Sequence, residues 1–168
     1  MKTLILGLGN PILGDDGVGW RVVEEVAKRL PSPPSPLPRG EGRRGEGEVE
    51  IDYASLGGLS LMERLTGSDH VILVDSIFTG TKPIGTVSHF ALSELPDLTA
   101  GHSASAHDTS LRNALNVGRS MNIPLPKDED VLIVAIEAKR VYDFSEKLSE
   151  PVETSVPKAV ETVLELLE

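Results

Sequence analysis

The fold is decided by one stretch, Leu6-Gly7-Leu8-Gly9-Asn10-Pro11-Ile12-Leu13-Gly14-Asp15-Asp16-Gly17-Val18-Gly19. It follows an aliphatic run at residues 3–8 that predicts a buried strand, and it leads into a helical pattern. Glycines at 7 and 9 allow a sharp exit from the strand and a close approach of other backbone. Such a strand–turn–helix often binds phosphate, because helix N-termini attract anions. Asp15 and Asp16 would repel a phosphate, so this loop is better suited to a cation.

Composition limits the classes of function. The chain has 168 residues, enough for one domain over residues 1–168 with a full hydrophobic core. It has no cysteine, which excludes disulfides, thiolate metal sites and cysteine nucleophiles. The net charge of −10 argues against nucleic acid or an anionic membrane as a partner. No run approaches the roughly 20 apolar residues of a membrane span, and the N-terminus does not read as a signal peptide. We expect a cytoplasmic protein.

Strands and helices alternate along the chain. Predicted strands cover residues 3–8, 49–55, 68–77, 85–92 and 131–136. Predicted helices cover residues 16–30, 59–65, about 108–121, and a C-terminal segment with Pro157 in its first turn. This alternation predicts a three-layer α/β/α domain around a mostly parallel sheet.

A low-complexity tract interrupts this pattern at about 31–48. It is rich in Pro and Gly and almost free of apolar side chains, so it cannot bury enough surface to offset its chain entropy. We interpret it as a surface insertion, which costs little when it is placed between a helix and a strand. A docking arm or an SH3-type ligand is the alternative function for this tract.

Three polar residues fall where a parallel sheet binds its ligands. Ligands lie beyond the carboxyl ends of the strands, where the strand order reverses. Asp16 follows the first strand, Asp75 closes the Val71–Val74 run, and His107 precedes a helix. Two carboxylates and one imidazole are a suitable ligand set for a borderline divalent ion.

Each of these residues also has a structural interpretation. Asp16 is a favoured helix-capping residue, and its carboxylate would stabilise a helix N-terminus. Asp75 could accept hydrogen bonds from a turn, and His107 could be a solvated loop residue. His102 competes with His107 for the ligand role.

Four segments together resemble a known family. Residues 4–19, 71–75, 105–115 and 135–137 are similar, in order and spacing, to the hydrogenase maturation proteases, the endopeptidases that trim the large subunit of nickel–iron hydrogenases. The resemblance covers nearly the whole chain outside residues 31–48. It implies a phosphorylase/hydrolase-like α/β fold with a mixed, mostly parallel five-stranded sheet in the order 2-1-3-5-4, whose fourth strand is antiparallel. The weak strand at residues 85–92 would then lie at the edge.

The resemblance also implies a metal-contacting set. Carried over by position, it consists of Asp16, Asp75 and His107, the three residues selected above. The first family position is often Glu, so Asp16 reaches one methylene less far. Ala135 stands where the family more often has Gly.

The implied activity is removal of a C-terminal peptide from the large-subunit precursor after nickel insertion. The nickel belongs to the precursor and is no permanent cofactor of the protease, which we expect to be a monomer. Asp16 and Asp75 would be catalytic, with either carboxylate as general base or with nickel polarising the carbonyl. Gly9, Asn10 and Asp15 would form the loop that receives the substrate.

Three other functions use part of the same pattern. A non-catalytic, nickel-sensing chaperone of the precursor would need the same three residues. A peptidyl-tRNA hydrolase-like esterase shares the Gly-Leu-Gly-Asn-Pro strand exit, but no Thr-Arg-His-Asn segment follows and the charge of −10 opposes tRNA. A nucleotide-binding module needs a third glycine in phase, and Asp15 and Asp16 stand where the phosphates would lie.

Overall fold

The computed structural model describes residues 1–30, 47–95, 106–139 and 144–168, with backbone alone for 106–110. The strands are β1 (Lys2–Leu8), β2 (Glu48–Ala54), β3 (His70–Ile77), β4 (Val87–Ala91) and β5 (Val131–Glu137). The helices are α1 (Val18–Arg29), α2 (Gly58–Leu65), α3 (Ala106–Ser120) and α4 (Glu150–Glu165). Short 3-10 turns cover Gly14–Gly17, Leu92–Glu94 and Asp128–Asp130.

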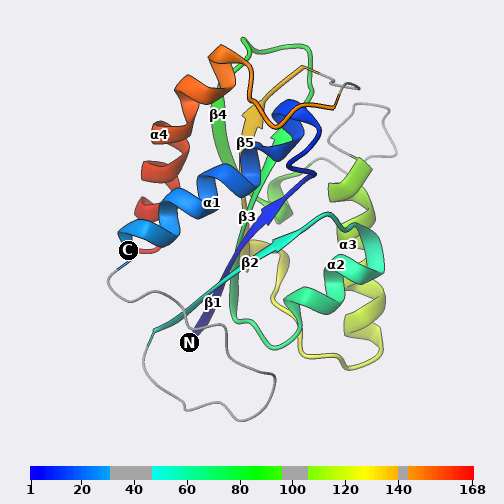
Figure 1. Ribbon diagram of the computed structural model, residues 1–168. Helices are drawn as coiled ribbons and strands as arrows, with labels where there is room; N and C mark the ends of the chain where they lie inside the picture. The colour runs from blue at the N-terminus through cyan, green and yellow to red at the C-terminus, as the bar shows by residue number, and fades with distance from the viewer. Residues whose placement is uncertain (31–46, 96–105, 140–143) are drawn as a thin grey trace.

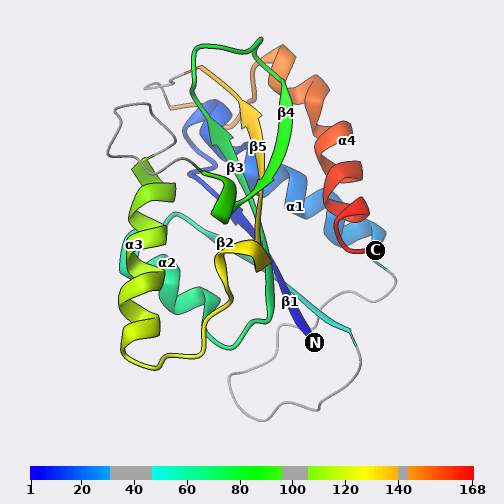
Figure 2. The same ribbon diagram turned by 180° about the vertical axis from the view of Figure 1, so that it is seen from behind.

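The strands form one sheet in the order β2-β1-β3-β5-β4, with β4 antiparallel to β5 and the other pairs parallel. Helices α1 and α4 cover one face of this sheet, and α2 and α3 cover the other (Figures 1 and 2). The expected three-layer architecture, strand order and antiparallel edge strand are therefore confirmed. Because β1, β2, β3 and β5 run in the same direction, they end on one side, called here the carboxyl end of the sheet.

Alternating side chains supply two separate cores. On β3, Val71 and Leu73 pack toward α2 and α3, whereas Ile72 and Val74 pack toward α1 and α4. Successive side chains of a strand point to opposite faces. Since both faces of β3 are covered by helices, its sequence is continuously apolar rather than alternating. Among the described residues, no helix is long and apolar enough to cross a membrane.

Helix α1 crosses the sheet unusually closely at Gly19. A Cβ atom on Gly19 would lie 2.2 Å from the carbonyl oxygen of Val74 and 2.5 Å from that of Leu8. A Cβ on Gly7 would in turn lie 2.8 Å from the carbonyl oxygen of Gly19. The two glycines thus allow α1 to begin directly over the ends of β1 and β3.

Several element boundaries differ from the prediction. Helix α1 begins at Val18 rather than Asp16, because residues 14–17 form a tighter 3-10 turn with Gly14 at a φ of 57°. Glu48 is the first residue of β2 rather than part of the insertion, because it pairs with Lys2 on β1. Gly47 immediately precedes β2, and residues 31–46 of that tract lie outside the described residues.

The other two differences concern α3 and α4. Helix α3 runs from Ala106 to Ser120, so it begins two residues before the predicted start at about 108. Helix α4 begins at Glu150, so Pro151 stands in its first turn and Pro157 in its interior. Pro157 has no N–H, so α4 lacks one of its internal hydrogen bonds there.

Candidate functional site

The predicted site residues come from three elements that meet at the carboxyl end of the sheet. Asp16 lies in the 3-10 turn after β1, and Asp75 lies near the end of β3. His107 is the second residue of α3, which begins near this end of the sheet (Figure 2). The side chain of His107 and the whole of His102 lie outside the described part of the chain.

The structure connects Asp16 to the residue that follows Asp75. One oxygen of Asp16, Oδ1, lies 3.5 Å from the hydroxyl of Ser76, which donates to it. The other, Oδ2, accepts a hydrogen bond from the backbone N–H of Asn10 at 2.7 Å. Asp16 is half-buried, so its carboxylate is held in the loop and still reaches solvent. This contact brings the turn after β1 against the end of β3.

Gly9 is required by this arrangement. Its φ is +114°, a conformation that side chains rarely adopt. A Cβ there would lie 1.9 Å from the backbone oxygen of Asp16. Gly9 and Asn10 therefore hold Asp16 in place, Gly9 by its lack of a side chain and Asn10 by its hydrogen bond. Their predicted contact with a substrate stays a prediction.

Asp75 is a buried carboxylate on the α2 and α3 face. It is 8% exposed, and its Oδ1 accepts a hydrogen bond from the backbone N–H of Ser76 at 2.8 Å. Its partner across the sheet is Ala135 on β5. Because paired residues of neighbouring strands share a face, the small side chain of Ala135 lies beside this carboxylate.

Asp15 has a partner inside the fold. Its side chain is only 2% exposed, and Ser149 donates to it from both the backbone N–H, at 2.6 Å, and the hydroxyl, at 2.8 Å. Ser149 is the residue before α4. The carboxylate of Asp15 thus lies buried against the start of α4, and its predicted contact with a substrate stays a prediction.

The segment before α4 also pairs with the opening loop. Ser145 accepts a hydrogen bond from the N–H of Gly14 at 2.7 Å and donates one to the carbonyl of Ile12 at 2.9 Å. Sequence reasoning missed this contact. No local pattern marks it, because the two segments lie at opposite ends of the chain.

Glu137 is a further polar residue at this end of the sheet, to which the sequence assigned no role. It is 1% exposed at the end of β5, and it pairs with Ile77 on β3, so it shares the face of Asp75. Its Oε1 accepts hydrogen bonds from the N–H and the hydroxyl of Thr79, both at 2.8 Å, and from the N–H of Gly80 at 3.0 Å. Its Oε2 is buried without a hydrogen-bond partner among the described residues. Glu137 thus fixes the chain as it leaves β3.

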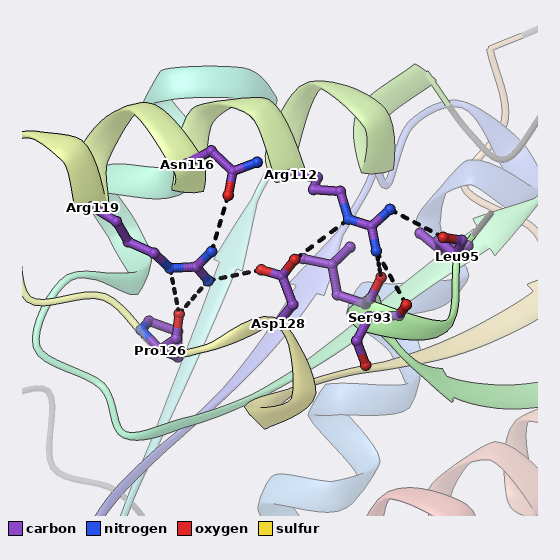
Figure 3. A network of polar contacts seen from close by, with 8 residues as sticks. Ser93, Leu95, Arg112, Asn116, Arg119, Pro126 and Asp128 are labelled. Carbon is purple, nitrogen blue, oxygen red and sulfur yellow. Dashed lines mark hydrogen bonds and ion pairs between the residues drawn. The ribbon is translucent and has the colours of Figure 1, made fainter. Parts of the chain in front are cut away.

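A polar network holds α3 in place (Figure 3). Arg112 and Arg119, both on α3, each donate to Asp128, at 3.4 and 2.8 Å. Arg112 also donates to the backbone carbonyls of three residues around the turn after β4, namely Leu92, Ser93 and Leu95. The network binds α3 to the segments beside it, and so it positions the backbone of His107.

The described side chains do not form a metal site by themselves. Among them no group of three His, Cys, Asp or Glu residues is arranged to hold a metal ion. The predicted set needs His107 as its third member, and that side chain is not described. In that predicted set, Asp16 and Asp75 would be the two oxygen donors.

Comparisons with known proteins agree with this fold. A sequence profile described as hydrogenase maturation protease matches residues 20–166. The hydrogenase expression/formation protein HoxM of Azotobacter vinelandii is 26% identical, over 99% of this chain and 72% of its own. The solved structure of the hydrogenase maturating endopeptidase HybD of E. coli has a TM-score of 0.74 and 27% identity, over 99% of this chain and 92% of that one. The HybD maturation protease of Thermococcus kodakarensis has a TM-score of 0.70 and 25% identity, over the full length of both chains.

Proposed function

Because this chain belongs to the hydrogenase maturation protease family and is a peptidase, we propose that it removes a C-terminal peptide from the large-subunit precursor of a nickel–iron hydrogenase after nickel has been inserted. The observation that supports this proposal is that Asp16 follows β1 and Asp75 lies near the end of the neighbouring strand β3, both at the carboxyl end of the sheet. The Ser76 hydroxyl, next to Asp75, lies 3.5 Å from Asp16. Adjacent strands thus deliver two carboxylates to the place where such sheets bind ligands.

The donor set suits nickel that arrives with the substrate. Asp16 and Asp75 offer oxygens, and His107 in the first turn of α3 would offer a nitrogen. Such a mixed set suits a borderline divalent ion. As the metal is held by the precursor, these residues would occupy its open coordination positions and anchor the precursor. A precursor without nickel lacks that anchor, which makes cleavage wait for the metal.

Binding through the metal also positions the scissile bond. Holding the peptide beside the two carboxylates converts an encounter into an intramolecular reaction, which is worth several orders of magnitude in effective concentration. One of the carboxylates can then take a proton from the attacking water, or nickel can polarise the scissile carbonyl. We propose further that the protease acts as a monomer in the cytoplasm.

A cleavage assay with two forms of the precursor tests the proposal. Purified precursor is prepared with and without nickel, incubated with the protease, and its C-terminus is followed by intact-mass spectrometry. We expect a mass loss in the nickel-loaded form alone. An intact loaded precursor, or equal cleavage of both forms, would contradict the proposal.

The matched control is a carboxylate at the other end of the sheet. Asp69 accepts a hydrogen bond from the backbone N–H of Lys2 at 2.6 Å, where β1 begins. Asp69→Asn makes the same change of charge as Asp75→Asn but lies far from the carboxyl end. It should leave processing unchanged, which separates a local effect from a change in net charge.

A further inference from the structure

Two exposed apolar side chains project from paired segments beside the site. Ile12, in the opening loop, is 45% exposed, and Phe144, in the segment before α4, is 83% exposed. The residue after Phe144, Ser145, donates its N–H to the carbonyl of Ile12. The two segments lie side by side near the top of Figure 1, drawn in blue and orange. We call these two residues the Ile12–Phe144 platform.

The platform is held by backbone pairing. Gly14 and Ser145 are joined by a hydrogen bond of 2.7 Å, Ser145 and Ile12 by one of 2.9 Å, and Asp15 holds Ser149 further along. Phe144 therefore stands next to a segment fixed to the opening loop. Exposed apolar side chains that lie together on a surface are typical of interaction sites, whereas single ones are not.

A pocket of about 260 Å³ adjoins the platform. Its apolar walls are Pro11, Ile12, Trp20 and Leu148, and one arginine and two glutamates also line it. The ring of Trp20 packs against that of Tyr53 with centroids 5.2 Å apart. Burial, and then the nearby carboxylate of Glu24, raise the pKa of Tyr53. Aromatic and aliphatic side chains are enriched at the centres of protein interfaces, and charged groups at their rims.

The platform is continuous with the candidate site. The loop that carries Pro11 and Ile12 begins at Asn10, whose N–H binds the carboxylate of Asp16 at 2.7 Å. A polypeptide that reaches Asp16 from this side must therefore lie along the same loop. The pocket and the candidate site thus share one loop, and this continuity favours the molecule bound at Asp16 as the occupant of the pocket.

We propose that the Ile12–Phe144 platform and its pocket bind an apolar segment of the precursor next to the scissile bond. This inference rests on the proposed function, since it takes the precursor as the partner. Asp16, Asp75 and His107 would recognise whether nickel is present, and the platform would recognise the polypeptide that carries it. Affinity for the precursor would then have an apolar part that does not depend on the metal.

Binding of purified precursor to variants tests the platform. Ile12→Asp and Phe144→Asp place a charge on the surface, where the fold tolerates it, and each should raise the dissociation constant and the KM about tenfold. Phe144→Leu keeps an apolar side chain and should restore most of the affinity. Val117→Asp and Met121→Asp are matched controls, because these residues are 50% and 68% exposed at the far end of α3. They should bind like the wild type.

The outcomes separate the two proposals. If Ile12→Asp and Phe144→Asp bind the precursor as tightly as Val117→Asp, the platform is overturned, even where the wild type cleaves normally. If the wild type binds the loaded precursor without cleaving it, the proposed function fails. The dissociation constants of the Ile12→Asp and Phe144→Asp variants then still show whether the platform binds the precursor. A wild type that does not bind at all overturns both. A dimer that Phe144→Asp dissociates, seen by sedimentation, would assign the platform to a second copy and overturn its role for the precursor.

Discussion

Asp15 receives two hydrogen bonds from Ser149, at 2.6 Å from its backbone N–H and at 2.8 Å from its hydroxyl, across 134 positions of sequence. The contact joins the opening loop to the residue that precedes α4. A carboxylate at a helix N-terminus is favoured by the exposed N–H groups and by the helix dipole. Because Asp16 is the next residue, this contact also holds one of the two candidate catalytic carboxylates.

Asp15→Ala should therefore lower the free energy of unfolding more than most substitutions outside the apolar core do. The change leaves the N–H of Ser149 without its partner, and a hydrogen bond to a charged acceptor contributes about 1.5–3 kcal/mol. Urea denaturation measures the loss. Ser149→Ala is the control, since it removes the hydroxyl bond alone and should cost about 1 kcal/mol. Equal losses in the two variants would argue against the backbone contact.

Gly9→Ala should displace Asp16. The added Cβ would lie 1.9 Å from the backbone oxygen of Asp16, at a φ of +114°. We expect a loss of about 2 kcal/mol or more in the free energy of unfolding, together with reduced processing. Gly67→Ala is the matched control, because Gly67 has a φ of +79° and open space around it. It should cost about 1 kcal/mol and leave processing intact; a similar defect in both would show that strain alone, not Asp16, is responsible.

Asp16→Asn, Asp75→Asn and His107→Ala should each lower processing by about a hundredfold or more, as loss of a catalytic acid–base group does. The two Asp→Asn variants should keep the fold, because the amide oxygen can still accept the backbone hydrogen bond of Asn10 at position 16 and of Ser76 at position 75. Circular dichroism and thermal unfolding check the fold, and precursor mass checks the activity. If His102→Ala were inactive and His107→Ala active, the choice of histidine would be wrong.

Glu137→Ala should loosen the chain that leaves β3. The buried Oε1 serves three donors, from Thr79 and Gly80, and their loss should cost about 2–4 kcal/mol. Glu137→Gln keeps an oxygen for these donors and should cost less than about 1 kcal/mol. Thermal and urea unfolding of both variants measure the difference. If Gln is as harmful as Ala, the hydrogen bonds to Oε1 are not what stabilises this chain.

The amino-acid sequence by itself was sufficient to predict the elements. Continuous apolar runs such as residues 71–74 predicted buried strands, and four-residue spacing from Val18 predicted α1, because burial within one element leaves a period in the sequence. The rule that ligands bind beyond the carboxyl ends of parallel strands then selected Asp16 and Asp75. The strand order came from the resemblance to a family and was not contained in the periodicity.

Tertiary structure alone decided what the polar residues of the loops contact. Asp15 and Asp16 are neighbours of the same type, yet one is buried against Ser149 and the other lies beside Ser76. The partners of Glu137 and the pairing of Ser145 with Ile12 likewise join segments distant in sequence. Loops carry no period, and a hydrogen bond between distant residues forms only after the sheet has brought them together. The sequence thus determined that Asp15, Asp16 and Asp75 lie at the carboxyl end of the sheet. Tertiary contacts decided which of these carboxylates stabilises the fold, because those contacts join segments distant in sequence.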